Sequence, residues 1–446
     1  MNLKLNTGIQ FYINIINLDD ITEIEEKATG EVKHTIHALD SFFTAIESYG
    51  KKHYKDSFVV EKITGSRLHM YVVNNNIEAS FDAVSAVSQY AYKLTRYLND
   101  NVAKYKTLQP FQIQVGACYG NFYEFYFKRI NMEEMTTIGY VANYAAKLQN
   151  LALPMNICIS ENLYEAIDIE QKKSFTCVQS GRIKKYNQNC YYATTLSQLT
   201  SKYNFQKDLE RAGIIASQVD LQEMNFRDAI QPISYTNLSK TECKKLSGIP
   251  LFADVRGFTP QFDKDDINLE EMTLKTQQIL TTMFEIVEKC KGIHVQFQGD
   301  REMAIFHDYS NYSCISDAVV AGLRIIDGVK PFQVCVGVGQ SYGRLFAAKI
   351  GARNEKDNIL IGRTVTEADQ NEDKKANGNQ LVISEQIYKK LRKENSGLVE
   401  LFQKIDEQSY YTELGYSEFV KKQSQHQLEN ENKHKNYNGA WKEMTF

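Results

Sequence analysis

The chain lacks the long apolar runs, leader sequences and paired cysteines that would direct it to a membrane or an oxidising compartment. No apolar run in its 446 residues approaches the roughly 18 residues of a membrane span. Its first residues, MNLKLNTGIQFYINII, lack the ordered regions of a signal peptide. The 8 cysteines are scattered singly, without the paired spacing of zinc sites. These absences predict a soluble protein of the reducing cytoplasm.

Charge of one sign is not in excess either. The 52 basic and 55 acidic residues leave a formal net charge of -3, and both signs are mixed throughout. The sequence therefore shows no basic stripe for nucleic acid and no patch for a membrane surface, and we expect neither partner. The length exceeds one typical domain, and 43% hydrophobic residues suffice for two buried cores. Two domains are the expectation.

The chain repeats itself. The segment ISENLYEAI at Ile159 recurs as ISEQIYKKL at Ile383, 224 residues later. A glycine-containing strand pattern also recurs and pairs Gly116 with Gly337, 221 residues later. A small drift in such offsets is what loop insertions produce between two copies of one fold. The repeats predict a tandem duplication.

Each copy has the pattern strand, helix, strand, strand, helix, strand. This order predicts an α/β fold, an α+β sandwich of the ferredoxin-like type with additions. The predicted domains span 8–195 and 248–415, with a connector at 196–247. The tail at 416–446 is polar enough that we expect it to be loosely ordered.

Four motifs in this order resemble those of the class III nucleotidyl cyclases, the adenylate and guanylate cyclase family. In the second copy they include FADVRGFT, GDREMAIF and VGVGQSYG, and in the first copy the helix IGYVANYAAKLQ. Each motif alone is a weak signal, but the set recurs in order in both halves. The resemblance implies two cyclase domains in tandem that pair within one chain as a pseudo-heterodimer. It also implies cyclisation of a nucleoside triphosphate.

Two acidic residues are the candidate metal ligands. Asp254 interrupts the apolar strand LFADV, where a carboxylate must be paired or hold a metal. Asp300 lies in the hairpin turn QGDR, and the two strands are neighbours in this fold. The resemblance implies that the pair binds two divalent cations, Mg²⁺ or Mn²⁺. The alternative for Asp300 is an ordinary turn residue.

The predicted transition-state residues lie in the first copy. The resemblance implies that Asn143 orients the ribose and that Lys147 stabilises the pentavalent phosphate. Their i, i+4 spacing places both on one helix face. Relatives have arginine where this chain has Lys147, and lysine keeps the charge but loses the two-pronged contact. The second copy has Thr366 and Gln370 at these positions. The alternative is a polar helix face in solvent.

The two copies complement each other. In the first copy, Asn14 aligns with Asp254 and Ser66 with Asp300, so the carboxylate pair is missing there. Class III active sites form between two cyclase domains, so the resemblance implies one competent site between the two copies. The second, pseudo-symmetric site is expected to be degenerate.

Base recognition is expected from Lys62 and Thr136, which match the family's positions. Lys62 can donate to a carbonyl or ring nitrogen, and Thr136 replaces a charged acceptor with a hydroxyl that donates or accepts. This combination favours a pyrimidine, with UTP first and CTP second. An outward-facing strand lysine is the alternative for Lys62.

Phosphate contacts are expected from two segments. The turn after the first strand of the second copy exposes the backbone amides of Gly257, Phe258 and Thr259. Near the end of the first copy, Lys184 and Lys185 match a basic strand end that touches the triphosphate in relatives. A strand-to-helix turn and a solvated charge run are the alternatives.

The predicted function is a nucleotidyl cyclase that makes a cyclic mononucleotide and pyrophosphate. The chain resembles the pyrimidine cyclases of bacterial anti-phage signalling, whose product activates a separate effector protein. An adenylate cyclase is one alternative. A catalytically inactive nucleotide-binding sensor or scaffold is the other.

Overall fold

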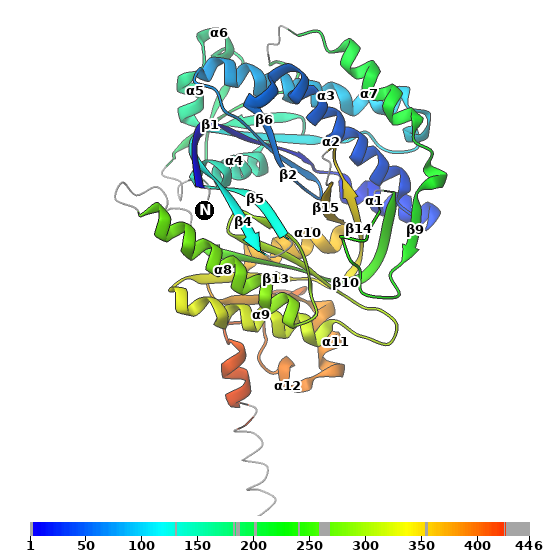
Figure 1. Ribbon diagram of the computed structural model, residues 1–446, viewed down its shortest axis with the longest axis vertical. Helices are drawn as coiled ribbons and strands as arrows, with labels where there is room; N and C mark the ends of the chain where they lie inside the picture. Colours follow the sequence, from blue (N-terminus) through cyan, green and yellow to red (C-terminus); the bar gives the residue numbers. More distant parts are fainter. Residues whose placement is uncertain are drawn as a thin grey trace, which may run out of the picture.

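The computed structural model of the chain forms two stacked halves, each with its own sheet (Figure 1). Helices α2 (Lys33–Tyr54) and α3 (Ile77–Asn101) cover the first sheet, whereas α8 (Leu269–Lys289) and α9 (Ile315–Val329) cover the second. The structure describes residues 3–129, 132–181, 183, 188–199, 203–239, 241–257, 268–352, 356–422 and 424.

The first half has the predicted order of elements. Its strands form a sheet in the order β2-β3-β1-β4-β6-β8-β7, with β5 paired to β4. Apolar residues at helical spacing let α2 and α3 bury one face on this sheet. The elements are β1 (Leu3–Ile15), α1 (Leu18–Thr29), α2 (Lys33–Tyr54), β2 (Phe58–Thr64), β3 (Arg67–Val72), α3 (Ile77–Asn101), β4 (Ile113–Arg129), β5 (Met132–Ile138), α4 (Tyr140–Leu151), β6 (Asn156–Ile159), α5 (Glu161–Ala166), α6 (Ile169–Lys172), β7 (Thr176–Gln179) and β8 (Cys190–Thr195).

The second half repeats this topology in the order β11-β12-β10-β13-β16-β18-β17. The predicted α/β fold with two halves of one topology in tandem is thereby confirmed. Its elements are β9 (Asn225–Asp228), β10 (Glu242–Arg256), α8 (Leu269–Lys289), β11 (Ile293–Gln298), β12 (Arg301–His307), α9 (Ile315–Val329), β13 (Cys335–Gln340), β14 (Gly343–Ile350), β15 (Asp357–Ile361), α10 (Arg363–Gln370), β16 (Gln380–Ser384), α11 (Glu385–Glu394), α12 (Ser396–Val399), β17 (Gln403–Lys404) and β18 (Ser409–Thr412). In the sequence segment that connects the two halves, α7 (Gln206–Gln218) packs on α2 and α3 of the first half.

The repeat alignment needs one correction. The sequence paired Gly116 with Gly337, but the structural counterpart of Gly116 is Gly339. A Cβ atom at Gly116 would lie 2.3 Å from the carbonyl oxygen of Ala145, and one at Gly339 would lie 2.4 Å from that of Ala368. Each glycine thus allows a helix backbone to lie directly on its sheet. The error arose because the second copy has glycine at both 337 and 339.

Each half contributes a hairpin to the core of the other. Phe125, Phe127 and Ile138 of β4 and β5 pack in the second core. In return, Phe346 and Ile359 of β14 and β15 pack in the first core. This exchange joins the two sheets and closes the space between them. Within the described part of the chain, no helix has the length and apolar character to cross a bilayer.

Candidate active site between the two halves

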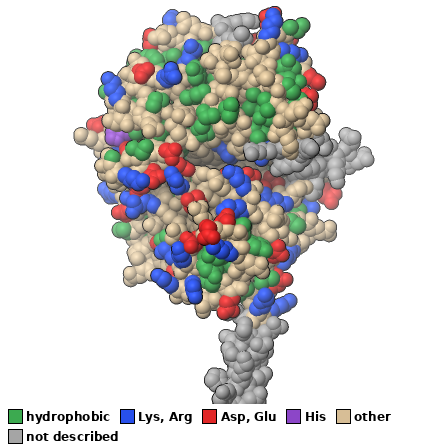
Figure 2. All heavy atoms as spheres, turned by 180° about the vertical axis from the view of Figure 1, so that it is seen from behind, with side chains coloured by type: hydrophobic (Ala, Val, Ile, Leu, Met, Phe, Trp, Pro, Cys, Tyr) green, Lys and Arg blue, Asp and Glu red, His purple; other side chains and the backbone are tan. Residues whose placement is uncertain are grey.

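A cavity of about 220 Å³ lies where the two halves meet. The surface is hollowed along this line, with acidic and basic side chains gathered beside it (Figure 2). The first half lines the cavity with β1, β2, β3, β5 and α4, and the second half with β10, the β11–β12 turn and the end of α10. Side chains from both copies therefore meet in one site.

The structure brings the two predicted metal ligands together. Asp254 lies near the end of β10 opposite Arg301, and Asp300 lies in the turn just before that arginine. Withdrawal from water and the charge of Asp300 raise the pKa of Asp254 to about 7. Withdrawal from water and the nearby Glu372 likewise raise the pKa of Asp300 to about 7. Both carboxylates line the cavity.

This pair fits a hard divalent cation. The Asp300 side chain is buried, and its Oδ2 atom accepts no hydrogen bond from the residues that the structure describes. Two all-oxygen ligands that repel each other are stabilised by a cation such as Mg²⁺ or Mn²⁺. Within the described ranges, no cluster of three or more histidine, cysteine, aspartate or glutamate side chains is arranged to hold a metal. The aspartate pair is therefore the candidate donor set.

Two arginines and a glutamate surround the pair, and the sequence analysis missed them. Arg256 Nη1 lies 2.8 Å from Asp254 Oδ2, and the same guanidinium pairs with Glu372. Arg301 pairs with Glu372 at 2.6 Å and with Asp369 at 2.7 Å. Gly116 and Gly339 are 223 residues apart, and the same offset relates Glu372 to a position on α4, the helix of the first copy that lines the cavity. The repeat could therefore have indicated Glu372 as a residue near the site.

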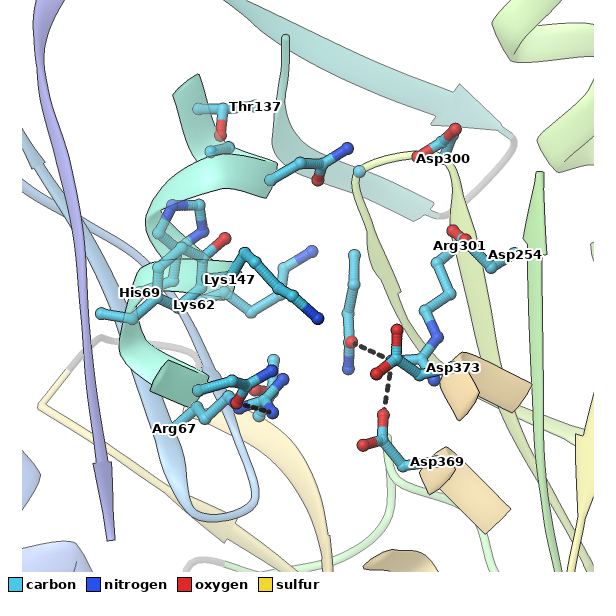
Figure 3. Close-up of a pocket in the computed structure, with 18 of the residues that line it drawn as sticks. Lys62, Arg67, His69, Thr137, Lys147, Asp254, Asp300, Arg301, Asp369 and Asp373 are labelled. Carbon is cyan, nitrogen blue, oxygen red and sulfur yellow. Dashed lines mark hydrogen bonds and ion pairs between the residues drawn. The ribbon is translucent and has the colours of Figure 1, made fainter. Parts of the chain in front are cut away.

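The predicted ribose and transition-state residues face the same cavity from α4. Asn143, Lys147 and Asn150 line it, and their i, i+4, i+7 spacing gives one face of the helix. In Figure 3, Lys147 points across the cavity toward the side that carries Asp254 and Asp300. The arrangement brings residues predicted from separate copies into one site.

Lys62 also lines the cavity, and its side chain is buried. Its Nζ donates to Glu134 Oε1 at 2.6 Å and to the carbonyl of Phe297 in the second half. Glu134 in turn accepts from His294 at 3.1 Å. Lys62 is thus part of a buried ionic network across the interface, in addition to its place on the cavity wall.

Thr136 does not line the cavity, whereas its neighbour Thr137 does. The Thr136 hydroxyl donates to Glu61 at 3.1 Å and accepts from the Gly299 amide at 2.8 Å. Successive residues of a strand point to opposite faces, so Thr137 takes the position facing the cavity. Thr136 instead connects the two halves beside the Asp300 turn.

An aromatic and ionic layer completes the inner wall. Tyr12 stacks on His69 with ring centroids 4.0 Å apart, and both residues line the cavity. His69 Nδ1 lies 3.0 Å from Glu61 Oε2, and Thr137 also donates to Glu61. Withdrawal from water opposes ionisation, but His69 holds the pKa of Glu61 down to about 2. This wall was missed because its members are separated widely in the sequence.

The pseudo-symmetric position lacks the carboxylate pair, as predicted. Asn14 lies opposite Arg67 just as Asp254 lies opposite Arg301, so the alignment of these positions is confirmed. Ser66 Oγ donates to Asn14 Oδ1 at 2.8 Å. A neutral hydrogen bond thus replaces two carboxylates beside a second cavity of about 740 Å³.

The predicted phosphate-binding residues are described only in part. Gly257 follows β10 with a φ of 67°, a left-handed conformation that favours glycine. Phe258, Thr259, Lys184 and Lys185 lie outside the described residues.

Comparison with known proteins agrees with this geometry. A family model described as the adenylate and guanylate cyclase catalytic domain matches residues 9–194. A uridylate cyclase of Pseudomonas aeruginosa is 22% identical over 394 residues, covering 81% of this chain and 74% of the relative. A uridylate cyclase of Treponema porcinum is 24% identical over 239 residues, covering 50% of this chain and 80% of the relative.

A solved structure covers almost the whole chain. A class III adenylyl cyclase-like ATP-binding protein from Pseudomonas aeruginosa aligns with a TM-score of 0.72 at 16% identity, covering 94% of this chain and 90% of that one. This likeness shows that the two chains share one fold. Residues 9–194 match the family model of the adenylate and guanylate cyclase catalytic domain, and the second half repeats the same order of strands.

Proposed function

We propose that this protein is a nucleotidyl cyclase that converts a nucleoside triphosphate into a 3′,5′-cyclic mononucleotide and pyrophosphate. One observation carries the proposal: a single cavity is lined by Asp254 and Asp300 of the second half and by Asn143 and Lys147 of the first. Each half lacks what the other supplies. A site of this composition suits in-line attack of a ribose hydroxyl on the α-phosphate.

The roles follow from the chemistry of each side chain. Two divalent cations held by Asp254 and Asp300 would lower the pKa of the ribose 3′-hydroxyl and neutralise charge on the leaving oxygens. The Asn143 amide is suited to hydrogen-bond and orient the ribose. The Lys147 ammonium is suited to stabilise the charge that grows on the phosphate. Gly257 begins the turn proposed to lie against the triphosphate, together with the amides of 258 and 259.

We further propose a pyrimidine substrate, with UTP ahead of CTP. The names of the two curated relatives support uracil. The cavity supports a small base, because the stacked rings of Tyr12 and His69 occupy its inner wall. Lys62 can donate to a uracil carbonyl. Thr137, rather than Thr136, is the hydroxyl on the cavity wall, so base choice is expected to depend on Lys62 and Thr137.

The experiment is to incubate the purified protein with ATP, GTP, CTP and UTP separately, with Mn²⁺ or Mg²⁺, and to identify products by mass. Cyclic UMP as the main product, absent for Asp254→Asn, is the expected result. Turnover of ATP alone would make the protein an adenylate cyclase. Binding without turnover of any nucleotide would make it a sensor or scaffold.

The biological role that we propose is signalling in anti-phage defence, where the cyclic nucleotide activates a separate effector protein. This role rests on the resemblance to pyrimidine cyclases of such systems. Phage challenge of cells that express the wild type or Asp254→Asn, with cyclic UMP measured at intervals, tests it. Equal cyclic nucleotide levels in both strains would contradict it.

A further inference from the structure

Arg67 lies beside the predicted transition-state residues although no motif drew attention to it. It begins β3 and lines both this cavity and the second, larger one, and its Nη2 atom donates to Asn150 Oδ1 at 3.1 Å. Asn150 stands three residues after Lys147 and seven after Asn143 on α4, on the same face of the helix. A guanidinium is therefore held along the wall that carries Lys147.

The two walls of the cavity carry opposite charge at this point. Arg67 and Lys147 lie on the side of the first half, and Asp369 and Asp373 lie on the side of the second half (Figure 3). Arg67 is near enough to lower the pKa of Asp369, although withdrawal from water opposes this and Arg301 contributes more. A metal-bound triphosphate between these walls would face the cationic side chains of Arg67 and Lys147 on the side of the first half.

The counterpart of Arg67 in the second half shows what a structural arginine looks like in this fold. Arg301 occupies the equivalent strand position, opposite Asp254 as Arg67 is opposite Asn14. Arg301 is buried and ion-paired with two carboxylates, at 2.6 Å and 2.7 Å. The hydrogen bond from Arg67 goes to a neutral amide, and a guanidinium has five N–H donors, so Arg67 can keep this bond while it binds a phosphate oxygen.

We propose that Arg67 binds the phosphate oxygens of the substrate and supplies the guanidinium that Lys147, a lysine at an arginine position of the family, does not provide. The proposal rests on the proposed function. A guanidinium makes two parallel contacts to a phosphate, whereas an ammonium acts as a point charge. Asn150 is the positioning residue that holds Arg67 on the cavity wall.

The test compares Arg67→Gln, Arg67→Lys and Lys147→Arg in the full chain, alone and combined. Removing one preorganised donor to developing charge costs about 10²- to 10³-fold in turnover, so kcat for UTP with Mn²⁺ should fall about 100-fold in Arg67→Gln. Arg67→Lys should recover only part of this. Adding Lys147→Arg to Arg67→Gln should restore at least tenfold, because it returns a guanidinium to the same wall.

Two further measurements separate phosphate binding from a structural role. Arg67→Gln should bind inorganic triphosphate with Mn²⁺ at least tenfold more weakly by calorimetry, with unchanged urea unfolding. The matched control is Arg211→Gln, an exposed arginine of α7, which should match the wild type in both assays.

Three results would overturn the inference. Wild-type kcat and wild-type triphosphate binding in Arg67→Gln would do so, as would an activity loss that tracks a loss of folded protein. The third result is that Arg67→Gln loses activity, that adding Lys147→Arg does not restore it, and that triphosphate binding is unchanged. Arg67 would then bind a ligand in the second, larger cavity, which it also lines. If the wild type cyclises no nucleotide, the proposed function fails, and triphosphate binding still tests Arg67.

Discussion

Replacing Asp300 with asparagine should abolish cyclisation and at the same time stabilise the metal-free protein. Asp300 has an ordinary pKa of 3.8, which burial and nearby carboxylates raise to about 7 in the folded state. This pKa shift is about three pH units, and each unit corresponds to about 1.4 kcal/mol. Ionising Asp300 in the folded protein above pH 7 therefore costs about 4 kcal/mol of stability. Asparagine has nearly the same shape and no charge.

The sign of the pH dependence follows from the direction of the shift. An acid with a raised folded pKa costs nothing below its unfolded pKa of 3.8, and the cost grows as the pH rises to about 7. Asp300→Asn should therefore gain about 2 to 4 kcal/mol over the wild type at pH 8. The gain at pH 5 should be less than half as large.

The assay is urea unfolding followed by circular dichroism, in a chelator, at pH 5 and pH 8. Adding Mn²⁺ should stabilise the wild type and leave Asp300→Asn nearly unchanged, because one of the two oxygen ligands is lost. Asp56→Asn, an exposed aspartate, is the matched control and should follow the wild type. Equal stability of wild type and Asp300→Asn at pH 8 would refute the reasoning, because burial and the nearby carboxylates would then not make the ionised Asp300 unfavourable.

Other parts of the interface give further expectations, each measured by urea unfolding. Withdrawal from water lowers the pKa of His294, but two flanking glutamates outweigh this and raise it to about 9. The free energy of unfolding of the wild type should therefore fall by about 3 kcal/mol between pH 6.5 and 9, and that of His294→Gln should fall much less. Lys62→Met should lower the free energy of unfolding by about 3 kcal/mol, because it leaves Glu134 charged and partly unpaired. Adding Glu134→Gln should recover part of this loss, whereas additive losses would mean that the two residues are not coupled. Gly116→Ala should lower the free energy of unfolding by more than about 2 kcal/mol and reduce turnover, because its Cβ atom would lie 2.3 Å from the carbonyl oxygen of Ala145 in α4. Gly181→Ala is the control and should be neutral, because its Cβ atom would meet no atom within 4 Å. Similar effects of both changes would contradict this packing argument.

The candidate site was predictable only where residue type and local pattern carry the information. An aspartate in an apolar strand and a second one in a Gly-Asp turn are unusual enough to mark Asp254 and Asp300. The helix spacing of Asn143 and Lys147 is equally local, because 3.6 residues per turn decides which side chains share a face. The duplication followed from recurring segments and predicted that both halves share one order of elements along the chain.

Tertiary structure decided which neighbours those residues have. Thr136 and Thr137 are adjacent and identical in type, and the direction of one strand in the folded pair of halves determines which faces the cavity. Glu372 and Arg67 reach the site from segments about 300 residues apart, Glu372 from the helical turn after α10 and Arg67 from the start of β3. By itself the sequence determined the fold, its repetition and the residues with unusual local settings. The charges that surround them depend on packing across the interface, which no local pattern encodes.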